Sequence, residues 1–287
     1  DVLAARPDHF DALQMLGLIK LAKGQPAEAL RLVSTAMGMR KPSPQILLNY
    51  GLILNALERR QEALESFDQA IKQKSKFAEA HNNRGAVLAA LGRDEEALES
   101  YRKAIAIKPD YVDAHYNRGT SLRTLGRHEE SIKALDRALA LQPNHAKAHN
   151  NRGATLETSG KVADALAAYD RALALIPTFG EARLNRGRAL ALLDRADEAL
   201  ANFNTAIEHN PNDAEAYYNR GTIYLDQGRN DEAAADFAKA LTLKPGFPHA
   251  RFAACFAELP VAYIDETEIP RRRAAYEQKL RALSADI

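Results

Sequence analysis

The sequence has little of what marks a secreted, membrane or nucleic-acid-binding protein. Among 287 residues there is one cysteine, Cys255, and no tryptophan. One cysteine excludes an intrachain disulfide, so we expect a cytoplasmic protein. Lys and Arg number 39 against 38 Asp and Glu, a net charge of +1, which does not favour a nucleic-acid partner. No apolar run approaches the roughly 18 residues of a membrane span, and no signal-peptide layout opens the chain. We therefore expect neither nucleic acid nor membrane as a partner.

Catalytic motifs are also missing. The chain has no serine–histidine–acid arrangement, phosphate-binding loop, paired-cysteine spacing or dinucleotide fingerprint. His81, His115 and His149 recur at one interval and are expected on separate helices, about 10 Å apart, too far to share a metal. We predict packing roles for them. The sequence predicts no enzyme activity in this chain and no cofactor.

A strict period is what the chain does have. Hydrophobic residues make up 46% and charged residues 27%, as in soluble globular proteins. Six asparagines recur every 34 residues, each followed two residues later by glycine, and Gly17 lies one period earlier. The asparagines are Asn49, Asn83, Asn117, Asn151, Asn185 and Asn219. Thirty-four residues is the period of a helix–turn–helix repeat.

With each glycine as position 8, the chain divides into seven units. They span 10–43, 44–77, 78–111, 112–145, 146–179, 180–213 and 214–247. Residues 1–9 resemble the tail of a truncated preceding repeat. Residues 248–287 are predicted to form a partial repeat and a C-terminal capping helix, because terminal repeats have no neighbour on one face.

The residues within a unit suit two antiparallel helices. Positions 8, 20 and 27 are small. Positions 24 and 28, and position 11 from the second unit on, are large and apolar, so the helices can approach closely and fill the space between them. Glycine at position 15 suits a left-handed cap, although Glu58 and Asp194 replace it in two units. Proline at position 32 ends the second helix in the last five units. Asp110, Asn144 and Asn212 follow it and are predicted to cap the next helix.

This pattern resembles the tetratricopeptide repeat (TPR) over 238 of 287 residues. The resemblance implies an all-α fold: a right-handed TPR superhelix, or α-solenoid, of about seven helix-turn-helix repeats with a C-terminal capping helix. It also implies that the first helices line the concave wall. Positions 2, 5, 6, 9, 12 and 13 then face the groove, and the asparagines at position 6 form a line along it.

An asparagine amide carries a donor and an acceptor side by side, so it can pair with a peptide C=O and N–H together. We predict a non-catalytic protein–protein interaction module that binds protein or peptide segments in extended conformation. Replacing Asn117 and Asn151 by alanine should then weaken capture at constant stability. The open alternative is that these amides bond only to neighbouring repeats. The other groove residues that we predict to contact a ligand are Asn82, Tyr116, Asn150, Tyr218, Arg123 and Arg188.

The C-terminal residues carry a narrower resemblance. Residues 250–255, 257–260, Tyr263, 265–266 and 271–276 look like the junction between a TPR array and a glycosyltransferase domain in bacterial proteins of the SPINDLY or O-linked N-acetylglucosamine transferase type. In that family the position-6 asparagines hold acceptor proteins, which carries over to the six asparagines above, while Met15 breaks the series. The resemblance implies a transferase domain after Ile287, with a sugar-nucleotide donor and a protein acceptor.

Other interpretations stay open. A stand-alone TPR scaffold or adaptor would differ only in the residues after Ile287. A receptor for chaperone carboxyl termini would need lysine at groove positions, and position 5 has none. A homodimer through a terminal or convex surface is a further expectation. In the tail, we expect a helix near 269–283 to dock through Tyr276, Leu280 and Leu283, with residues 271–273 as its solvated start. Cys255 is predicted to be buried.

Overall fold

The chain is helical throughout the residues described by the computed structural model, which are 6, 9–259 and 268–284. They form sixteen α-helices and no strand. The expected tail of an earlier repeat at 1–9 lies almost entirely outside the described residues, as do residue 260, Tyr263 and residues 265–266 of the C-terminal resemblance. No helix in the described ranges is both long and apolar enough to cross a membrane.

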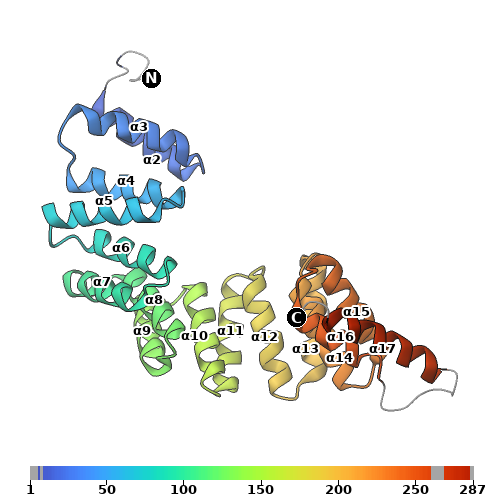
Figure 1. Ribbon diagram of the computed structural model, residues 1–287. Helices are drawn as coiled ribbons and strands as arrows, with labels where there is room; N and C mark the ends of the chain where they lie inside the picture. Colours follow the sequence, from blue (N-terminus) through green and yellow to red (C-terminus); the bar gives the residue numbers. More distant parts are fainter. Residues whose placement is uncertain (1–5, 7–8, 260–267, 285–287) are drawn as a thin grey trace. The chain divides into compact units, whose positions relative to one another are not determined.

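Fourteen of these helices form seven hairpins of one design (Figure 1). The first helices have 13 residues each and are α2 (Phe10–Ala22), α4 (Pro44–Ala56), α6 (Ala78–Ala90), α8 (Val112–Thr124), α10 (Ala146–Thr158), α12 (Gly180–Leu192) and α14 (Ala214–Asp226). The second helices have 14 residues each and are α3 (Pro26–Met39), α5 (Arg60–Gln73), α7 (Asp94–Ile107), α9 (His128–Leu141), α11 (Val162–Leu175), α13 (Ala196–His209) and α15 (Asn230–Leu243). The predicted all-α repeat of helical hairpins is confirmed.

The core of each hairpin is built on the glycine at position 8. In the third hairpin a methyl group added to Gly85 would lie 2.6 Å from Cε1 of Tyr101, which is itself 1% exposed. The alanines at positions 20 and 27, Ala97 and Ala104, are fully buried, and Ala97 belongs to the same core cluster as Tyr101. Glycine is therefore required because the aromatic side chain of the second helix occupies the space of a Cβ.

The turns confirm the left-handed caps and correct the N-caps. Glu58 and Asp194, which replace glycine at position 15, adopt φ angles of 59° and 58°. The N-cap is position 34, one residue later than predicted. Asp213, for example, accepts hydrogen bonds from the backbone N–H groups of Glu215 and Ala216 at 3.0 and 3.1 Å. Asp110, Asn144 and Asn212 lie in the preceding turn, because the first helix begins only at position 1 of the next unit.

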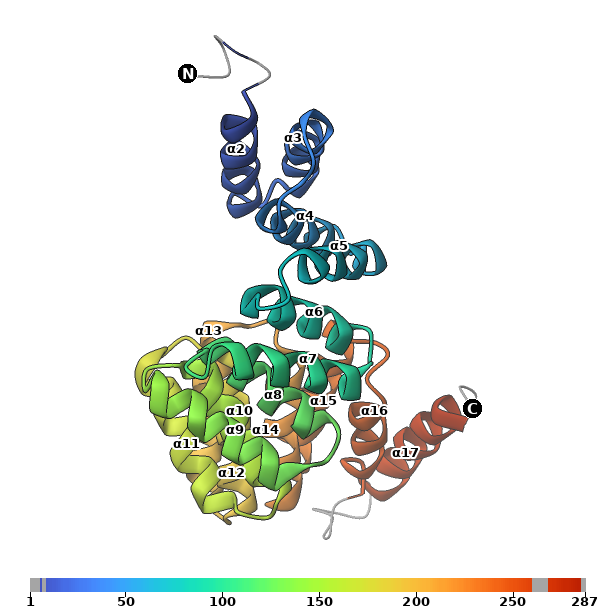
Figure 2. The same ribbon diagram turned by 90° about the vertical axis from the view of Figure 1, so that its left-hand side faces the viewer.

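The hairpins are grouped into two compact units, Asp1–Asn144 and His145–Ile287. Within each unit the first helices of consecutive hairpins contact one another directly, as α4 does with α6 and α12 with α14. The second helices of consecutive hairpins make no comparable contact in the described ranges. Each unit therefore curves with its first helices on the inner side, which can be followed in Figures 1 and 2.

The last two helices close the second unit. Helix α16 (Pro248–Phe256) packs on α15, and α17 (Glu268–Ser284) packs on α16, which confirms the capping helix. Cys255 is buried as predicted, and burial raises the pKa of its thiol.

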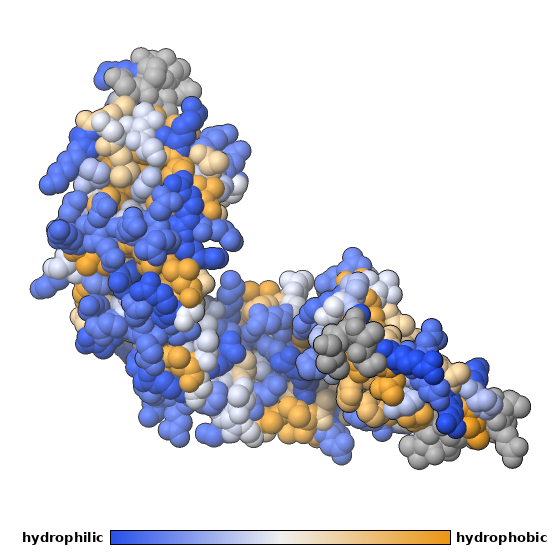
Figure 3. Space-filling model, viewed as in Figure 1, coloured by the Kyte–Doolittle hydropathy of each residue, from blue (hydrophilic) through white to orange (hydrophobic). Residues whose placement is uncertain are grey.

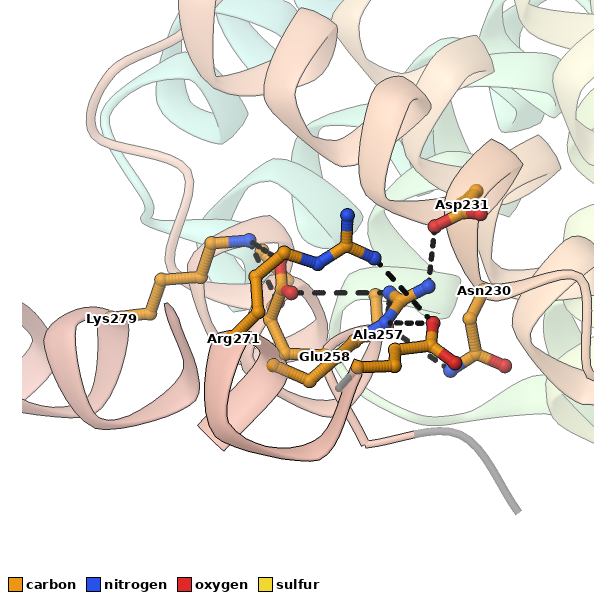
Figure 4. A network of polar contacts seen from close by, with 9 residues as sticks. Asn230, Asp231, Ala257, Glu258, Arg271 and Lys279 are labelled. Carbon is orange, nitrogen blue, oxygen red and sulfur yellow. Dashed lines mark hydrogen bonds and ion pairs between the residues drawn. The ribbon is translucent and has the colours of Figure 1, made fainter. Parts of the chain in front are cut away.

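The docking face of α17 differs from the prediction. Leu280 is 44% exposed, whereas Arg272 is only 6% exposed, so residues 271–273 are not a uniformly solvated start. Arg272 donates to Glu268 Oε1 at 2.9 Å and to Asp231 Oδ1 at 2.6 Å. Lys279 donates to Glu258 at 2.5 Å (Figure 4). Because α15 and the end of α16 present carboxylates here, the cap is held by ion pairs in addition to apolar contact.

Candidate functional site

The predicted groove residues lie on the inner first helices of both units. In the first unit they are Asn49 on α4, Asn82 and Asn83 on α6, and Tyr116, Asn117 and Arg123 on α8. In the second unit they are Asn150 and Asn151 on α10, Asn185 and Arg188 on α12, and Tyr218 and Asn219 on α14.

Two of the position-6 asparagines bond to the preceding repeat. Asn117 Nδ2 donates to Asn82 Oδ1 at 3.1 Å, and Asn185 Nδ2 donates to Asn150 Oδ1 at 2.9 Å. Each bond joins position 6 of one first helix to position 5 of the one before. Asn82 also makes a hydrogen bond with Tyr111. Burial raises the pKa of Tyr111 to about 12, and the bond with Asn82 acts in the opposite direction. At these two junctions the amides therefore stabilise the stacking of neighbouring hairpins.

Two other asparagines lack this bond because leucine replaces the acceptor. Position 5 of the preceding unit is Leu48 before Asn83 and Leu184 before Asn219. The side chain of Asn83 makes no hydrogen bond to any residue that the structure describes. Asn219 Nδ2 instead donates to the Glu215 carbonyl of its own helix at 2.8 Å. Both side chains are half-buried, so their polar atoms remain within reach of a ligand.

The remaining predicted residues differ in what they offer. Asn49 is 7% exposed and accepts from Gln45 at 3.2 Å. The ring centroid of Tyr218 lies 5.0 Å from that of Phe247, so it packs toward the C-terminal hairpin. Arg123 Nε is buried and has no acceptor among the residues described. Tyr116 and Asn151 are half-buried on α8 and α10.

A hollow of about 330 Å³ opens on the inner side of the second unit, across α10, α12 and α14. Its lining combines exposed apolar surface with polar groups: Leu192 is 63% exposed, and Arg188 and Asn219 also line the hollow. Arg188 donates to Asn185 Oδ1 at 2.7 Å and lies 3.8 Å from Glu157. The charge of Arg188 is therefore largely compensated, and the hollow suits a mainly apolar side chain.

Sequence reasoning missed several residues of this hollow. Glu157 and Ala191 occupy position 12, and Leu192 and Asp226 occupy position 13, all of them groove positions in the repeat frame. Their positions in the 34-residue repeat would have identified them as groove residues. The hydrophilic residues that cover most of the surface in Figure 3 separate its hydrophobic residues into small patches. In the described part of the chain no three histidine, cysteine or acidic side chains are placed to hold a metal ion.

Comparison with known proteins agrees with this geometry. Sequence models described as "Tetratricopeptide repeat" match residues 116–178, 158–206 and 184–248, and one described as "TPR repeat" matches 51–92 and 87–122. No curated protein matches the sequence.

Solved structures share the fold. YrrB, described as a TPR protein with an unusual peptide-binding site, has 27% identity and a TM-score of 0.55 over 66% of this chain and 98% of its own. A tetratricopeptide repeat protein from Parabacteroides merdae has 21% identity and a TM-score of 0.66, covering 86% of this chain and 98% of that one. The Cut9–Hcn1 assembly of the APC/C has 19% identity and a TM-score of 0.72, over 89% of this chain and 50% of that chain. The repeats of this chain are tetratricopeptide repeats, and it is a tetratricopeptide-repeat protein.

Proposed function

We propose that the chain is a non-catalytic module that binds extended segments of other proteins along the inner face of its first helices. The hollow across α10, α12 and α14 carries this proposal, because it combines exposed apolar surface with polar groups at groove positions. The peptide-binding site named for YrrB, which shares 27% of its residues with this chain, supports a peptide as the ligand class.

The spacing of the repeats suits an extended chain. Stacked first helices lie about 8–10 Å apart and an extended peptide advances about 3.3 Å per residue, so one helix meets the ligand roughly every three residues. An asparagine amide can pair with the peptide main chain at each of these points. Binding through the main chain tolerates many side-chain sequences, and the hollow adds a preference for an apolar residue.

The asparagines divide into two groups under this proposal. Asn83 in the first unit and Asn219 in the second have no cross-repeat partner among the described residues, and each contacts a ligand segment bound to its own unit. Asn117 and Asn185 hold neighbouring hairpins together, and Asn185 has both ends of its amide engaged. The bond between Asn117 and Asn82 makes Asn117 a poorer probe of binding than the sequence suggests, since its removal also costs stability.

The test compares two double variants. Asn83→Ala with Asn219→Ala should weaken binding of a peptide selected by phage display about fivefold or more, since each lost hydrogen bond is worth about 0.5–1.5 kcal/mol. The thermal midpoint should not change. Asn117→Ala with Asn185→Ala, the matched control, should lower the free energy of unfolding by about 1–3 kcal/mol. Fluorescence anisotropy and urea unfolding measure the two quantities. Equal peptide affinity in the wild type and the first variant would sink the proposal.

The narrower proposal is that the groove recognises acceptor proteins for a transferase of the SPINDLY or O-linked N-acetylglucosamine transferase type. It rests on the resemblance of the C-terminal residues, and the alternative is a stand-alone scaffold for multiprotein complexes. The residues encoded after Ile287 decide between them: a glycosyltransferase domain supports the first, and a stop codon or unrelated domain the second. We extend the proposal to a cytoplasmic location and to a homodimer through a terminal or convex surface, which light scattering tests.

A further inference from the structure

The arginines at position 7 share one arrangement in three hairpins. Each lies between position 25 of the preceding second helix and position 23 of its own. Arg84 donates to Asp68 at 2.6 Å and to Ser100 at 2.9 Å. Arg186 donates to Asp170 and Asn202 at 2.6 and 3.3 Å, and Arg220 donates to Asp236 and Asn204, both at 2.7 Å. Each of these guanidinium groups therefore has one carboxylate and one further polar acceptor.

Arg118 is the exception. Position 25 of the preceding helix is Arg102, and position 23 of its own is Ala134. Both acceptors are lost, and one is replaced by a second cation. The half-buried Arg118 side chain makes no hydrogen bond or ion pair with any residue in the described ranges. At these two positions the repeat therefore supplies Arg118 with no carboxylate.

The surface around Arg118 is hollow and basic. A hollow of about 380 Å³ between α8 and α9 is lined by Arg118, Lys133 and Arg137. The only carboxylate in its lining, Glu130, accepts two hydrogen bonds from Arg127, at 2.8 and 2.9 Å. Neither Lys133 nor Arg137 has an ion pair within the described parts of the chain. Three cations therefore line one cavity, and its one lining carboxylate is hydrogen-bonded to a fourth cation, Arg127.

A buried histidine in the same lining is also incompletely paired. His115 is 7% exposed, and its Nε2 donates to the Pro109 carbonyl at 2.9 Å. Its Nδ1 is buried and has no hydrogen-bond partner among the described residues. Buried polar atoms without partners are rare in folded proteins, so the polar groups of this region are not satisfied internally.

We propose that Arg118, Lys133 and Arg137 bind an acidic side chain of a partner protein, at a site separate from the inner groove. No residue lining this hollow occupies a groove position. The ligand class follows from the other repeats, where the arginine at position 7 binds a carboxylate of the protein itself: Asp68, Asp170 or Asp236. A guanidinium and a carboxylate are both planar and can form two parallel N–H···O hydrogen bonds. A second hollow of about 200 Å³ beside Arg118 is lined by Leu98 and Leu122 and by two ion pairs, Glu99 with Arg102 and Glu95 with Arg127, and it leaves room for the adjoining residue of the same segment.

Nuclear magnetic resonance of the ¹⁵N-labelled full chain gives a site-resolved test. The probe is the peptide acetyl-Glu-Glu-Leu-Glu-Glu-amide, and Arg118→Lys assigns the Arg118 Nε–H resonance. We expect the peptide to shift this resonance and to leave those of Arg84, Arg186 and Arg220 in place, because their acceptors are already present. No shift at Arg118, or equal shifts at all four, overturns the proposal. So does a response to inorganic phosphate with none to the peptide, which would identify a phosphate site.

A substitution that restores the missing acid is the matched control. Ala134→Asp places a carboxylate at the position that Asp236 occupies beside Arg220. It should reduce peptide affinity by at least about tenfold, as Arg118→Gln should, while circular dichroism and the unfolding midpoint are retained. Arg102→Asp, which copies Asp68 and Asp170, serves if Ala134→Asp does not fold. Undiminished affinity in a folded restored variant contradicts the proposal. In the groove variant with Asn83→Ala and Asn219→Ala, the peptide should still shift the Arg118 Nε–H resonance. The experiment can therefore disprove either site without disproving the other.

Discussion

At the scale of single residues, the repeat is most sensitive at glycine 8. The Gly85 Cα faces the Tyr101 ring, so a methyl group there would force the buried ring to move. We predict that Gly85→Ala lowers the free energy of unfolding by about 1–3 kcal/mol, as overpacking does. Urea unfolding followed by circular dichroism measures it.

The matched control is Gly38→Ala. Gly38 lies in helix α3, is exposed and has nothing within 4 Å of a built Cβ. The same substitution should raise stability there by up to about 1 kcal/mol, because alanine is the better helix former. If Gly85→Ala is as harmless as Gly38→Ala, the steric account of position 8 is wrong.

Asparagine shows the limit of residue-level reasoning. The same residue at the same position bonds across repeats at Asn117 and is without that bond at Asn83. The difference lies one repeat earlier, in Asn82 or Leu48 at position 5. Sequence periodicity predicted both asparagines as ligand contacts, because it identifies a face and not the partner on the neighbouring helix.

At the scale of elements, helix α17 depends on Arg272. This side chain is 6% exposed and bonds to Glu268, which is 7% exposed, and to Asp231 of α15. We predict that Arg272→Met removes one hydrogen bond to the buried Glu268 carboxylate and the bond to Asp231, and weakens the docking of α17 by about 1–3 kcal/mol. Hydrogen exchange with mass spectrometry should show faster exchange in α17 and unchanged protection in α10 to α13.

Its control is the adjacent residue. Among the described residues, Arg273 is paired only with Glu277 of its own helix, and its side chain is 77% exposed. Arg273→Met should therefore leave the exchange of α17 unchanged. Equal protection of α17 in both variants would show that the bonds of Arg272 do not hold the cap.

At the scale of the whole molecule, one ion pair recurs at the start of five second helices. An arginine at position 16 bonds to a glutamate at position 19, and each bond lowers the pKa of the glutamate. The pairs are Arg59–Glu62, Arg93–Glu96, Arg127–Glu130, Arg195–Glu198 and Arg229–Glu232. All are exposed, so each contributes little alone.

Together they predict a dependence of stability on pH. Because the folded-state pKa of each glutamate is lowered, the stability from the pair is present above the ordinary value of 4.5 and is lost as pH falls through the lowered value. We expect the temperature of the thermal midpoint to decrease when the pH is lowered below 4.5. The decrease should be smaller in a variant in which all five glutamates are replaced by glutamine. Scanning calorimetry between pH 7 and pH 3 measures this. A midpoint independent of pH would contradict it.

The sequence by itself determined the hairpin and its frame. The spacing of glycine 8, alanines 20 and 27 and the large residue at 24 predicted helices that the structure places at the same positions in all seven units. These features repeat because they depend on contacts within about 34 residues, so every unit reports the same local constraint.

Only the tertiary structure decided which repeated side chains have partners. Asn83, Arg118 and Arg272 each resemble other residues of their type in the sequence. Their environments differ because the acceptor beside each one comes from another helix, where a single leucine, alanine or aspartate changes the bond. The period fixes where such a side chain lies, and the neighbouring helix fixes whether its hydrogen bonds are made within the protein or left for a ligand.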